Sequence, residues 1–384
     1  MKLAFVSDSI YPYNKGGKET RSYELAVNLA KRGHEVHFYT MKFWKGKDVI
    51  KQNGFYLHGI CKAKPLYIDK GRRSISQAIY FGMNCIKLIK EDFDVVDADH
   101  MVYFHLFPVK LACLIKNKPM IITWHEVWGK DYWTKYMGKK GIIGYLMEKI
   151  SSRLPNKIIA ISNHTKENLI KKLNVNKEKI KVIPNAINFQ NIQKIKPSKA
   201  SPRDHPGGRH SDVIFAGRFL SHKNIDVLIK AISTLKKSHP NIKCILVGDG
   251  PEKSNLQQLT KRLNLTKNIK FTGIIDDLDD VHSLMKSSKV FVLPSTREGF
   301  GITVLEANAC SIPVITTSHK DNASKDLIKQ GKNGFICKLN EKDIADKIKT
   351  AIKQSQKMKH GCIDEAKKYD WKNIIKKFEG VYNG

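Results

Sequence analysis

Cysteine is scarce in this chain and irregularly placed. Only 7 of the 384 residues are cysteines, and no two of them form a Cys-x-x-Cys pair. An odd number at irregular spacing indicates neither a disulfide framework nor a zinc site. A reducing cytoplasm is therefore the simplest setting for the protein.

Long apolar runs are also missing. No stretch approaches the roughly 18 apolar residues that a transmembrane helix needs, so we expect any membrane contact to be peripheral. The apolar stretch at the N-terminus ends at Asp8. That length is too short for the apolar region of a signal peptide and predicts a first buried strand.

Acidic residues are outnumbered by basic ones. The chain has 36 Asp and Glu against 68 Lys and Arg, which gives a formal net charge of +32. Such an excess favours an anionic partner, such as nucleic acid, an acidic lipid surface or a phosphorylated substrate. Because the lysines are spread along the whole chain, a lysine-rich composition without functional meaning is an equally good explanation. No recognisable nucleic-acid module is present, so nucleic-acid binding ranks last.

Short apolar runs alternate with helical patterns in both halves of the chain. This rhythm predicts an α/β protein with two doubly wound parallel sheets. The predicted strands are 3–7, 35–40, 94–96, 120–124, 157–161, 213–216, 242–247, 269–272, 290–294 and 313–316. The segment 190–212 lies between the predicted strands 157–161 and 213–216. It is polar and contains three prolines, which is typical of a linker. We therefore predict an N-terminal domain at 1–189, a C-terminal domain at 190–363 and a terminal helix at 364–384, with ligands bound in a central cleft between the domains.

The most informative segment runs from Arg297 to Glu306, directly after a predicted strand. Glycines at positions 299 and 301 flank Phe300 and allow a ligand to approach the backbone. The helix that follows exposes N–H groups that suit phosphate. Glu298 and Glu306 then lie on either side of that phosphate, where they can accept hydrogen bonds from sugar and ribose hydroxyls. A nucleotide sugar has this layout.

A second segment, 216–224, follows the first predicted strand of the second half. Arg218 and Lys223 lie five residues apart across a turn and can clamp a diphosphate. Two such cations offset the charge that develops as a sugar leaves its diphosphate, so no metal ion or other cofactor is expected.

Together these segments resemble two signatures of the retaining glycosyltransferases of family 4, which have the GT-B fold. The first is a Glu-x7-Glu segment, and the second is Gly-Arg followed by Lys. The resemblance extends along nearly the whole chain and implies an activity: transfer of a sugar from a UDP- or GDP-linked donor to a hydroxyl. It also implies that Arg218 and Lys223 bind the leaving diphosphate, that Glu298 orients the donor sugar and that Glu306 holds the ribose.

Weaker matches add further candidate residues. Gly248 and Gly273 follow predicted strands and resemble turns that line the family's nucleotide pocket. Gly16 and Gly17 precede the first predicted helix, where backbone N–H groups can approach the donor or the acceptor. His125 ends a strand and resembles the family's histidine that contacts the donor sugar.

One segment has the sequence pattern of a metal site. Asp97-Ala98-Asp99-His100 has the Asp-x-Asp pattern of the other major glycosyltransferase fold, which needs a divalent cation. The Arg218 and Lys223 pair argues against that interpretation.

Two basic segments of the first half raise the question of an anionic membrane surface. Seven basic residues occur between Lys62 and Lys90, and seven more in 127–157, where they are mixed with aromatic residues that include Trp133. Such a mixture suits an anionic bilayer. A glycan or lipid-linked acceptor, with the protein peripheral on the inner face of a membrane, is one hypothesis. Packing of the aromatic residues on the core, with lysines in water, is the other.

A nucleotide-sugar epimerase of the same architecture is the main alternative function. It would turn over the donor without an acceptor.

Overall fold

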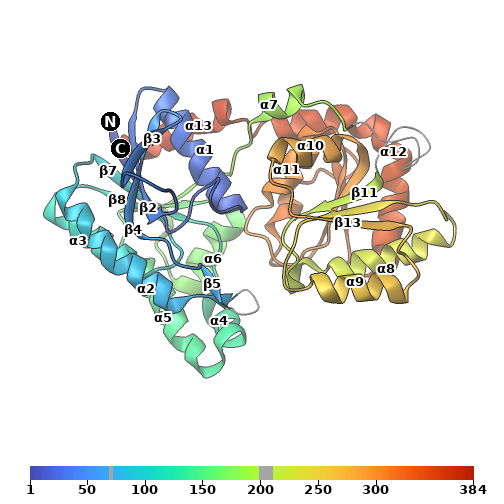
Figure 1. Ribbon diagram of the computed structural model, residues 1–384, viewed down its shortest axis with the longest axis horizontal. Coiled ribbons are helices and arrows are strands. Elements are labelled where there is room, and N and C mark those ends of the chain that lie inside the picture. The colour runs from blue at the N-terminus through green and yellow to red at the C-terminus, as the bar shows by residue number, and fades with distance from the viewer. Residues whose placement is uncertain (69–71, 199–210) are drawn as a thin grey trace. The chain divides into compact units, whose positions relative to one another are not determined.

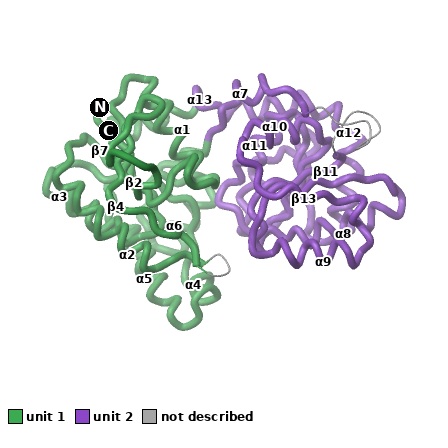
Figure 2. The backbone as a smooth tube through the Cα atoms, in the orientation of Figure 1, with its two compact units in different colours: residues 1–185, 374–384 green, residues 186–373 purple. Residues whose placement is uncertain are grey.

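The computed structural model describes residues 1–68, 72–198 and 211–384. Most of the predicted linker, including Pro202 and Pro206, lies outside the described residues, as does Lys70 in the first basic segment. The chain forms two compact units: unit 1 comprises Met1–Asn185 and Ile374–Gly384, and unit 2 comprises Ala186–Asn373 (Figure 2). The chain therefore passes between the units twice, at 185/186 and at 373/374.

Unit 1 is built on a sheet of eight strands in the order β10-β9-β8-β7-β1-β2-β4-β3 (Figure 1). Neighbouring strands are parallel except for β3, which runs antiparallel to β4 at the edge. The strands are β1 Lys2–Val6, β2 Glu35–Lys42, β3 Val49–Gln52, β4 Phe55–Lys62, β7 Val95–Asp99, β8 Met120–Trp124, β9 Lys157–Ala160 and β10 Ile180–Val182, with a small separate hairpin of β5 Tyr67–Ile68 and β6 Arg72–Arg73. The helices are α1 Gly17–Lys31, α2 Ile75–Asn84, α3 Leu106–Ile115, α4 Gly129–Met137, α5 Gly141–Ser151 and α6 Asn163–Leu173, and 3-10 turns lie at η2 Cys85–Lys90, η3 Gly138–Lys140 and η4 Lys177–Lys179.

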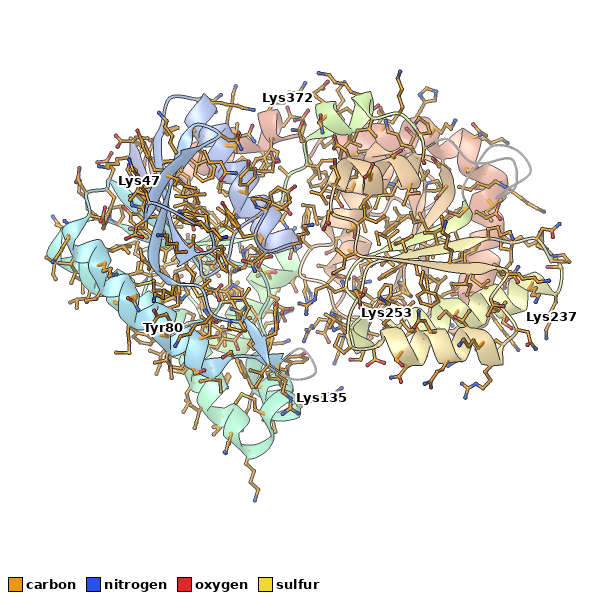
Figure 3. All side chains as sticks on the ribbon, in the orientation of Figure 1. Lys47, Tyr80, Lys135, Lys237, Lys253 and Lys372 are labelled. Carbon is orange, nitrogen blue, oxygen red and sulfur yellow. The ribbon has the colours of Figure 1, made fainter. Side chains whose placement is uncertain are left out.

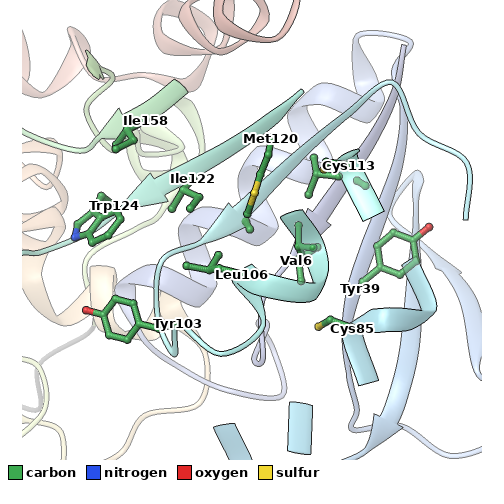
Figure 4. Close-up of a cluster of buried hydrophobic side chains, with 14 of the residues drawn as sticks. Val6, Tyr39, Cys85, Tyr103, Leu106, Cys113, Met120, Ile122, Trp124 and Ile158 are labelled. Carbon is green, nitrogen blue, oxygen red and sulfur yellow. The ribbon is translucent and has the colours of Figure 1, made fainter. Parts of the chain in front are cut away.

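Alternation along the strands gives this sheet two apolar faces. In β1, Ala4 and Val6 join a buried cluster with residues of α2, η2 and α3, part of which is drawn in Figure 4. Phe5 points the other way and packs on Phe38 and Tyr382, with ring centroids 6.1 and 6.3 Å apart. Helix α13, Trp371–Tyr382, therefore covers the face of the sheet opposite to α2 and α3.

Unit 2 contains a sheet of six parallel strands in the order β13-β12-β11-β14-β15-β16. The strands are β11 Ser211–Ala216, β12 Cys244–Val247, β13 Ile269–Gly273, β14 Ser288–Leu293, β15 Val314–Thr317 and β16 Gly334–Cys337. The helices are α7 Phe189–Lys194, α8 Ile225–Lys236, α9 Lys253–Arg262, α10 Leu278–Lys286, α11 Ile302–Ala309 and α12 Glu341–Lys367, with 3-10 turns at η5 Ser221–Lys223 and η6 Ala323–Leu327. Numbered from β11, this order is 3-2-1-4-5-6, which is the doubly wound order of dinucleotide-binding sheets.

The structure corrects two details of the sequence prediction. The polar segment after residue 189 begins with helix α7, which buries Phe189 and Ile192. The C-terminal helical region starts much earlier than residue 364, because α12 runs for 27 residues from Glu341 and ends at Lys367 before α13 begins. The rest of the predicted doubly wound α/β fold is confirmed in each unit.

All seven cysteines are free and buried. Lysines, in contrast, are distributed over both units, as Lys47, Lys135, Lys237, Lys253 and Lys372 illustrate (Figure 3). Within the described residues, none of the helices combines the length and the apolar character that a bilayer crossing requires.

Candidate functional site

The predicted residues of unit 2 gather at one edge of its sheet. Arg218 follows β11, Gly248 follows β12, Gly273 ends β13 and Glu298 follows β14. Because these strands are parallel, their carboxyl ends share one edge. The strand order reverses between β11 and β14, so the loops that carry Lys223 and Glu298 diverge at the switch point, where such sheets bind ligands.

Backbone and side-chain hydrogen bonds hold these two loops together. Asn224 Nδ2 donates to the carbonyl oxygen of Pro294 at 3.1 Å, and the Thr296 amide donates to the carbonyl oxygen of His222 at 2.9 Å. The Lys223 ammonium then donates to Glu298 Oε1 at 2.5 Å. The sequence predicts that Lys223 and Glu298 bind different parts of a ligand, and the structure pairs these two residues with each other.

Three cations surround His222 at this point. Burial and, to a smaller extent, the nearby charges of Arg297, Lys223 and Arg218 together lower the pKa of His222 to about 3. The imidazole is therefore neutral at physiological pH, and the local field is positive. Sequence reasoning identified two of these cations and missed Arg297, although it lies next to Glu298 in the chain.

Helix α11 begins beside this cluster. Its N-cap residue Gly301 has a φ of 92°, in the left-handed region that glycine tolerates best. A Cβ at this position would lie 2.5 Å from Ser324 Cβ, so the backbone also needs glycine for space. Gly299 and the buried Phe300 lead into the helix, whose N-terminal amides add positive character. Glu306 lies on the second turn, with its Oε1 3.8 Å from Nε2 of the buried His282.

The glycines at the other strand ends allow close backbone approach. Gly248 has a φ of 131°, and a Cβ there would lie 2.0 Å from the carbonyl oxygen of Gly217. Its amide donates to the carbonyl oxygen of Gly273 at 2.9 Å, which ties the ends of β12 and β13 together.

In unit 1, the predicted residues lie around a buried charge network. His125 follows β8 and donates from Nε2 to Asp99 Oδ1 at 2.9 Å. Lys18, one residue after Gly17, places its ammonium 3.6 Å from Asp99 Oδ2 and 3.2 Å from Asp8 Oδ1. The beginning of α1 and His125 are therefore linked through a single carboxylate.

Opposing effects set the ionisation of this network. Burial favours the neutral form of Asp99, but Lys18 and His125 outweigh it and hold the pKa of that carboxyl well below its usual range. Burial lowers the pKa of His125, and the hydrogen bond to Asp99 only partly opposes this effect. Nε2 carries a proton toward Asp99, so a neutral ring has its free lone pair on Nδ1.

Both carboxylates of the Asp-x-Asp segment contact other residues of the protein. Asp97 accepts hydrogen bonds from Thr123 at 2.8 Å and from Tyr382 at 2.6 Å. Burial raises the pKa of Asp97 to about 6. In the part of the chain that the structure describes, no group of histidine, cysteine and carboxylate side chains is arranged to hold a metal ion.

Two family models together match most of the chain. Residues 15–191 match Glycosyltransferase Family 4, and residues 202–369 match Glycosyl transferases group 1.

The chain belongs to the family 4 glycosyltransferases. This glycosyltransferase is 25% identical over 385 residues to the phosphatidylinositol N-acetylglucosaminyltransferase gpi3 subunit of Schizosaccharomyces pombe, covering 98% of this chain and 79% of the relative. It is 26% identical to an uncharacterized glycosyltransferase of Methanocaldococcus jannaschii, with 100% and 98% of the two chains covered.

Solved structures confirm the GT-B fold of the glycosyltransferase. A sucrose-phosphate synthase from Thermosynechococcus elongatus superimposes with a TM-score of 0.83 at 18% identity, covering 100% of this chain and 98% of the other. Anabaena HepE, solved in complex with UDP and glucose, gives a TM-score of 0.76 at 21% identity over 100% of both chains.

In the second basic segment, Trp133 does not face solvent as the membrane hypothesis required, and the other aromatic residues are partly buried. Trp133 is buried and donates from Nε1 to Glu148 at 3.0 Å. Its ring lies 4.6 Å from that of Trp128 and 6.3 Å from that of Tyr136. For these rings the alternative interpretation, packing on the core, is correct. The exposed apolar residues of this segment are aliphatic and lie on α5: Ile142, Ile143, Leu146 and Ile150.

Proposed function

We propose that this glycosyltransferase transfers a sugar from a UDP- or GDP-linked donor to a hydroxyl of a glycan or lipid-linked acceptor, with retention of configuration and without a metal ion. The observation that carries the proposal is the group of three cations around His222 at the switch point of the unit 2 sheet. A diphosphate matches that charge, and helix α11 begins beside the same loops.

The proposed roles follow from where charge changes during the reaction. As the bond between sugar and phosphate lengthens, negative charge accumulates on the diphosphate. Arg218, Lys223 and the amides around Gly301 stabilise this charge without reorganising, which lowers the barrier. A divalent ion would stabilise the same negative charge, so these groups make such an ion unnecessary.

In this proposal, the carboxylates and glycines orient the donor. Glu298 accepts from hydroxyls of the donor sugar while it holds the Lys223 ammonium, and Glu306 accepts from ribose hydroxyls. Gly248 and Gly273 let the nucleoside approach the backbone. For unit 1, the proposal assigns His125 to contacts with the donor sugar, and Gly16 and Gly17 to backbone contacts with the donor or the acceptor.

Bond making then completes the transfer. The acceptor oxygen bonds to the anomeric carbon on the face that the diphosphate leaves, and the hydroxyl proton passes to a departing phosphate oxygen. No residue serves as a covalent nucleophile in this scheme.

The relatives favour particular substrates. HepE was solved with UDP and with UDP-glucose, which favours a uridine donor. The S. pombe relative is named for N-acetylglucosamine and phosphatidylinositol, which favours an N-acetylhexosamine donor and a lipid acceptor. The epimerase alternative has no support from the family models or the relatives.

A thermal-shift screen against UDP, GDP and ADP, with and without EDTA, tests the donor site. We expect one nucleoside diphosphate to raise the melting temperature equally in both conditions. A shift that EDTA abolishes would contradict metal independence. No shift with any nucleotide would contradict the donor site itself, and donor turnover without acceptor would favour the epimerase.

A further inference from the structure

One surface of unit 1 exposes an unusual number of large apolar side chains. On α2 and η2 they are spaced along one stripe, and α3 adds a second set. We call this surface the α2–α3 face, and it comprises Ile75, Ile79, Met83, Ile86, Leu111, Leu114 and Ile115. Met83 is 70% exposed, Leu114 64% and Ile115 59%. Single exposed apolar residues are ordinary, but a contiguous group marks an interaction site.

The two helices form one continuous surface. Helix α3 contacts both α2 and η2, and Figure 1 shows α2 and α3 side by side along the same side of unit 1. The opposite faces of the two helices pack in the core, because Phe81, Leu106 and Val109 belong to the buried cluster under the sheet. Both helices are therefore apolar on two sides, and core packing accounts for only one of them.

The charge around this face is predominantly positive. Residues 72–90 and 100–118 contain no Asp or Glu, while they contain Arg72, Lys87, Lys90, Lys110, Lys116 and Lys118. Arg73 also lies in this range, but its guanidinium pairs with the buried Asp8. Of the carboxylates that follow η2, Glu91 accepts from Tyr39 at 3.1 Å, and Asp94 accepts from the Lys2 amide at 2.7 Å and pairs with Lys118 at 3.5 Å. Asp92 is largely exposed, 3.8 Å from the Lys2 ammonium.

We propose that the α2–α3 face docks this protein on a bilayer that contains anionic lipids. Aliphatic side chains enter the boundary between headgroups and acyl chains, and the surrounding lysines contact the lipid phosphates. A protein partner fits this composition less well, because protein interfaces are enriched in aromatic residues and Arg and depleted in Lys. The surface differs from the aromatic cluster at Trp133, which is buried.

Vesicle flotation tests the proposal with the full chain. The vesicles contain phosphatidylcholine alone or with about one-third phosphatidylglycerol, so that only the second kind has the negative surface that attracts lysines. The test variant is I79Q/M83Q/L114Q/I115Q. These four side chains are exposed, so we expect the variant to fold. The matched control is V49Q/L339Q, which changes exposed aliphatic residues on β3 and after β16.

We expect the intact protein and the control to float with the anionic vesicles, and the fourfold variant to bind at least about tenfold more weakly. Added salt should weaken binding of the intact protein because the lysine contribution is screened. No flotation of the intact protein, or equal flotation of the fourfold variant, would overturn the proposal.

Light scattering on the same proteins identifies a competing occupant. If the intact chain is dimeric, the fourfold variant is monomeric and neither floats, the face is an interface between copies and the proposal is wrong. Melting temperatures with UDP and GDP report the donor site separately. The proposal does not rest on the donor chemistry, so a failure of nucleotide binding would leave the vesicle result unchanged.

Discussion

Lys223 connects the two loops of the proposed donor site. Its ammonium contacts Glu298 at 2.5 Å and contributes to the positive field at His222. Replacing it with alanine removes one cation from the proposed diphosphate site and leaves Glu298 without its partner. Both changes disfavour an anionic ligand.

We expect Lys223→Ala to lower kcat/KM for sugar transfer by about 100-fold, as the loss of one preorganised charge contact does in other active sites. The nucleotide-induced thermal shift should also disappear. Lys230→Ala is the control, because Lys230 forms a half-exposed pair with Asp226 on α8 of the same unit. Equal activity in the two variants would contradict the proposed role.

The depressed pKa of His222 predicts a dependence of stability on pH. An unfolded histidine titrates near pH 6.5 and the folded His222 near 3. Between these values the unfolded state binds more protons, so this residue lowers stability as the pH falls from about 6.5.

We expect His222→Gln to lose less stability than the wild type between pH 7 and pH 5, by at most about 2 kcal/mol in urea unfolding. The exposed His239, changed to Gln, is the control. If the free energy of unfolding changed with pH equally in the His222 variant and the wild type, the imidazole would not be held neutral.

At the scale of single elements, the start of α11 depends on Gly301 for two separable reasons. Gly331 offers a matched comparison, because its φ of 76° is also left-handed but a Cβ there meets nothing within 4 Å. Gly331→Ala should therefore cost about 1 kcal/mol from backbone strain alone. Gly301→Ala should cost roughly 1–3 kcal/mol more, because Ser324 has to move to relieve the overpacking. Urea unfolding measures both, and equal losses would contradict the steric argument.

Strands with continuous apolar runs were predictable, as the agreement at Met120–Trp124 illustrates. Strand β3 was not, because Val49–Gln52 mixes apolar and polar residues at an edge of the sheet. Strand β4 was not either, because Tyr56, His58 and Gly59 interrupt its apolar residues. In the candidate site, motif spacing identified Lys223 and Glu298 but not their mutual contact. The contacts of the partly buried Lys18 with Asp8 and Asp99 were also unpredictable, because a lone lysine at the start of a helix usually faces water.

At the scale of the whole molecule, α13 completes unit 1. Phe378 is fully buried beneath the Arg21 guanidinium, 5.1 Å from its ring centroid. Tyr382 donates to Asp97, and Arg32 contacts both oxygens of Glu379 at 2.6 and 2.8 Å. Unit 1 therefore owes part of its core and two polar contacts to residues after 373.

We expect Phe378→Ala to destabilise unit 1 by about 3–5 kcal/mol, as truncation of a buried aromatic residue does elsewhere. Hydrogen exchange read by mass spectrometry should show faster exchange in peptides of unit 1 and unchanged exchange in peptides of 190–360. Lys377→Ala changes an exposed neighbour on the same helix and should have no effect. Equal acceleration in both units would mean that they unfold together.

The double passage of the chain between the units also bears on how the protein is made. Unit 2 is one continuous segment, whereas unit 1 needs Ile374–Gly384, which the ribosome adds only after unit 2 has been synthesised. The apolar surface around Phe5 and the buried Asp97 therefore stay open to water throughout translation of the second half. The N-terminal unit, although synthesised first, reaches its final state last, which reverses the usual order for a two-domain protein.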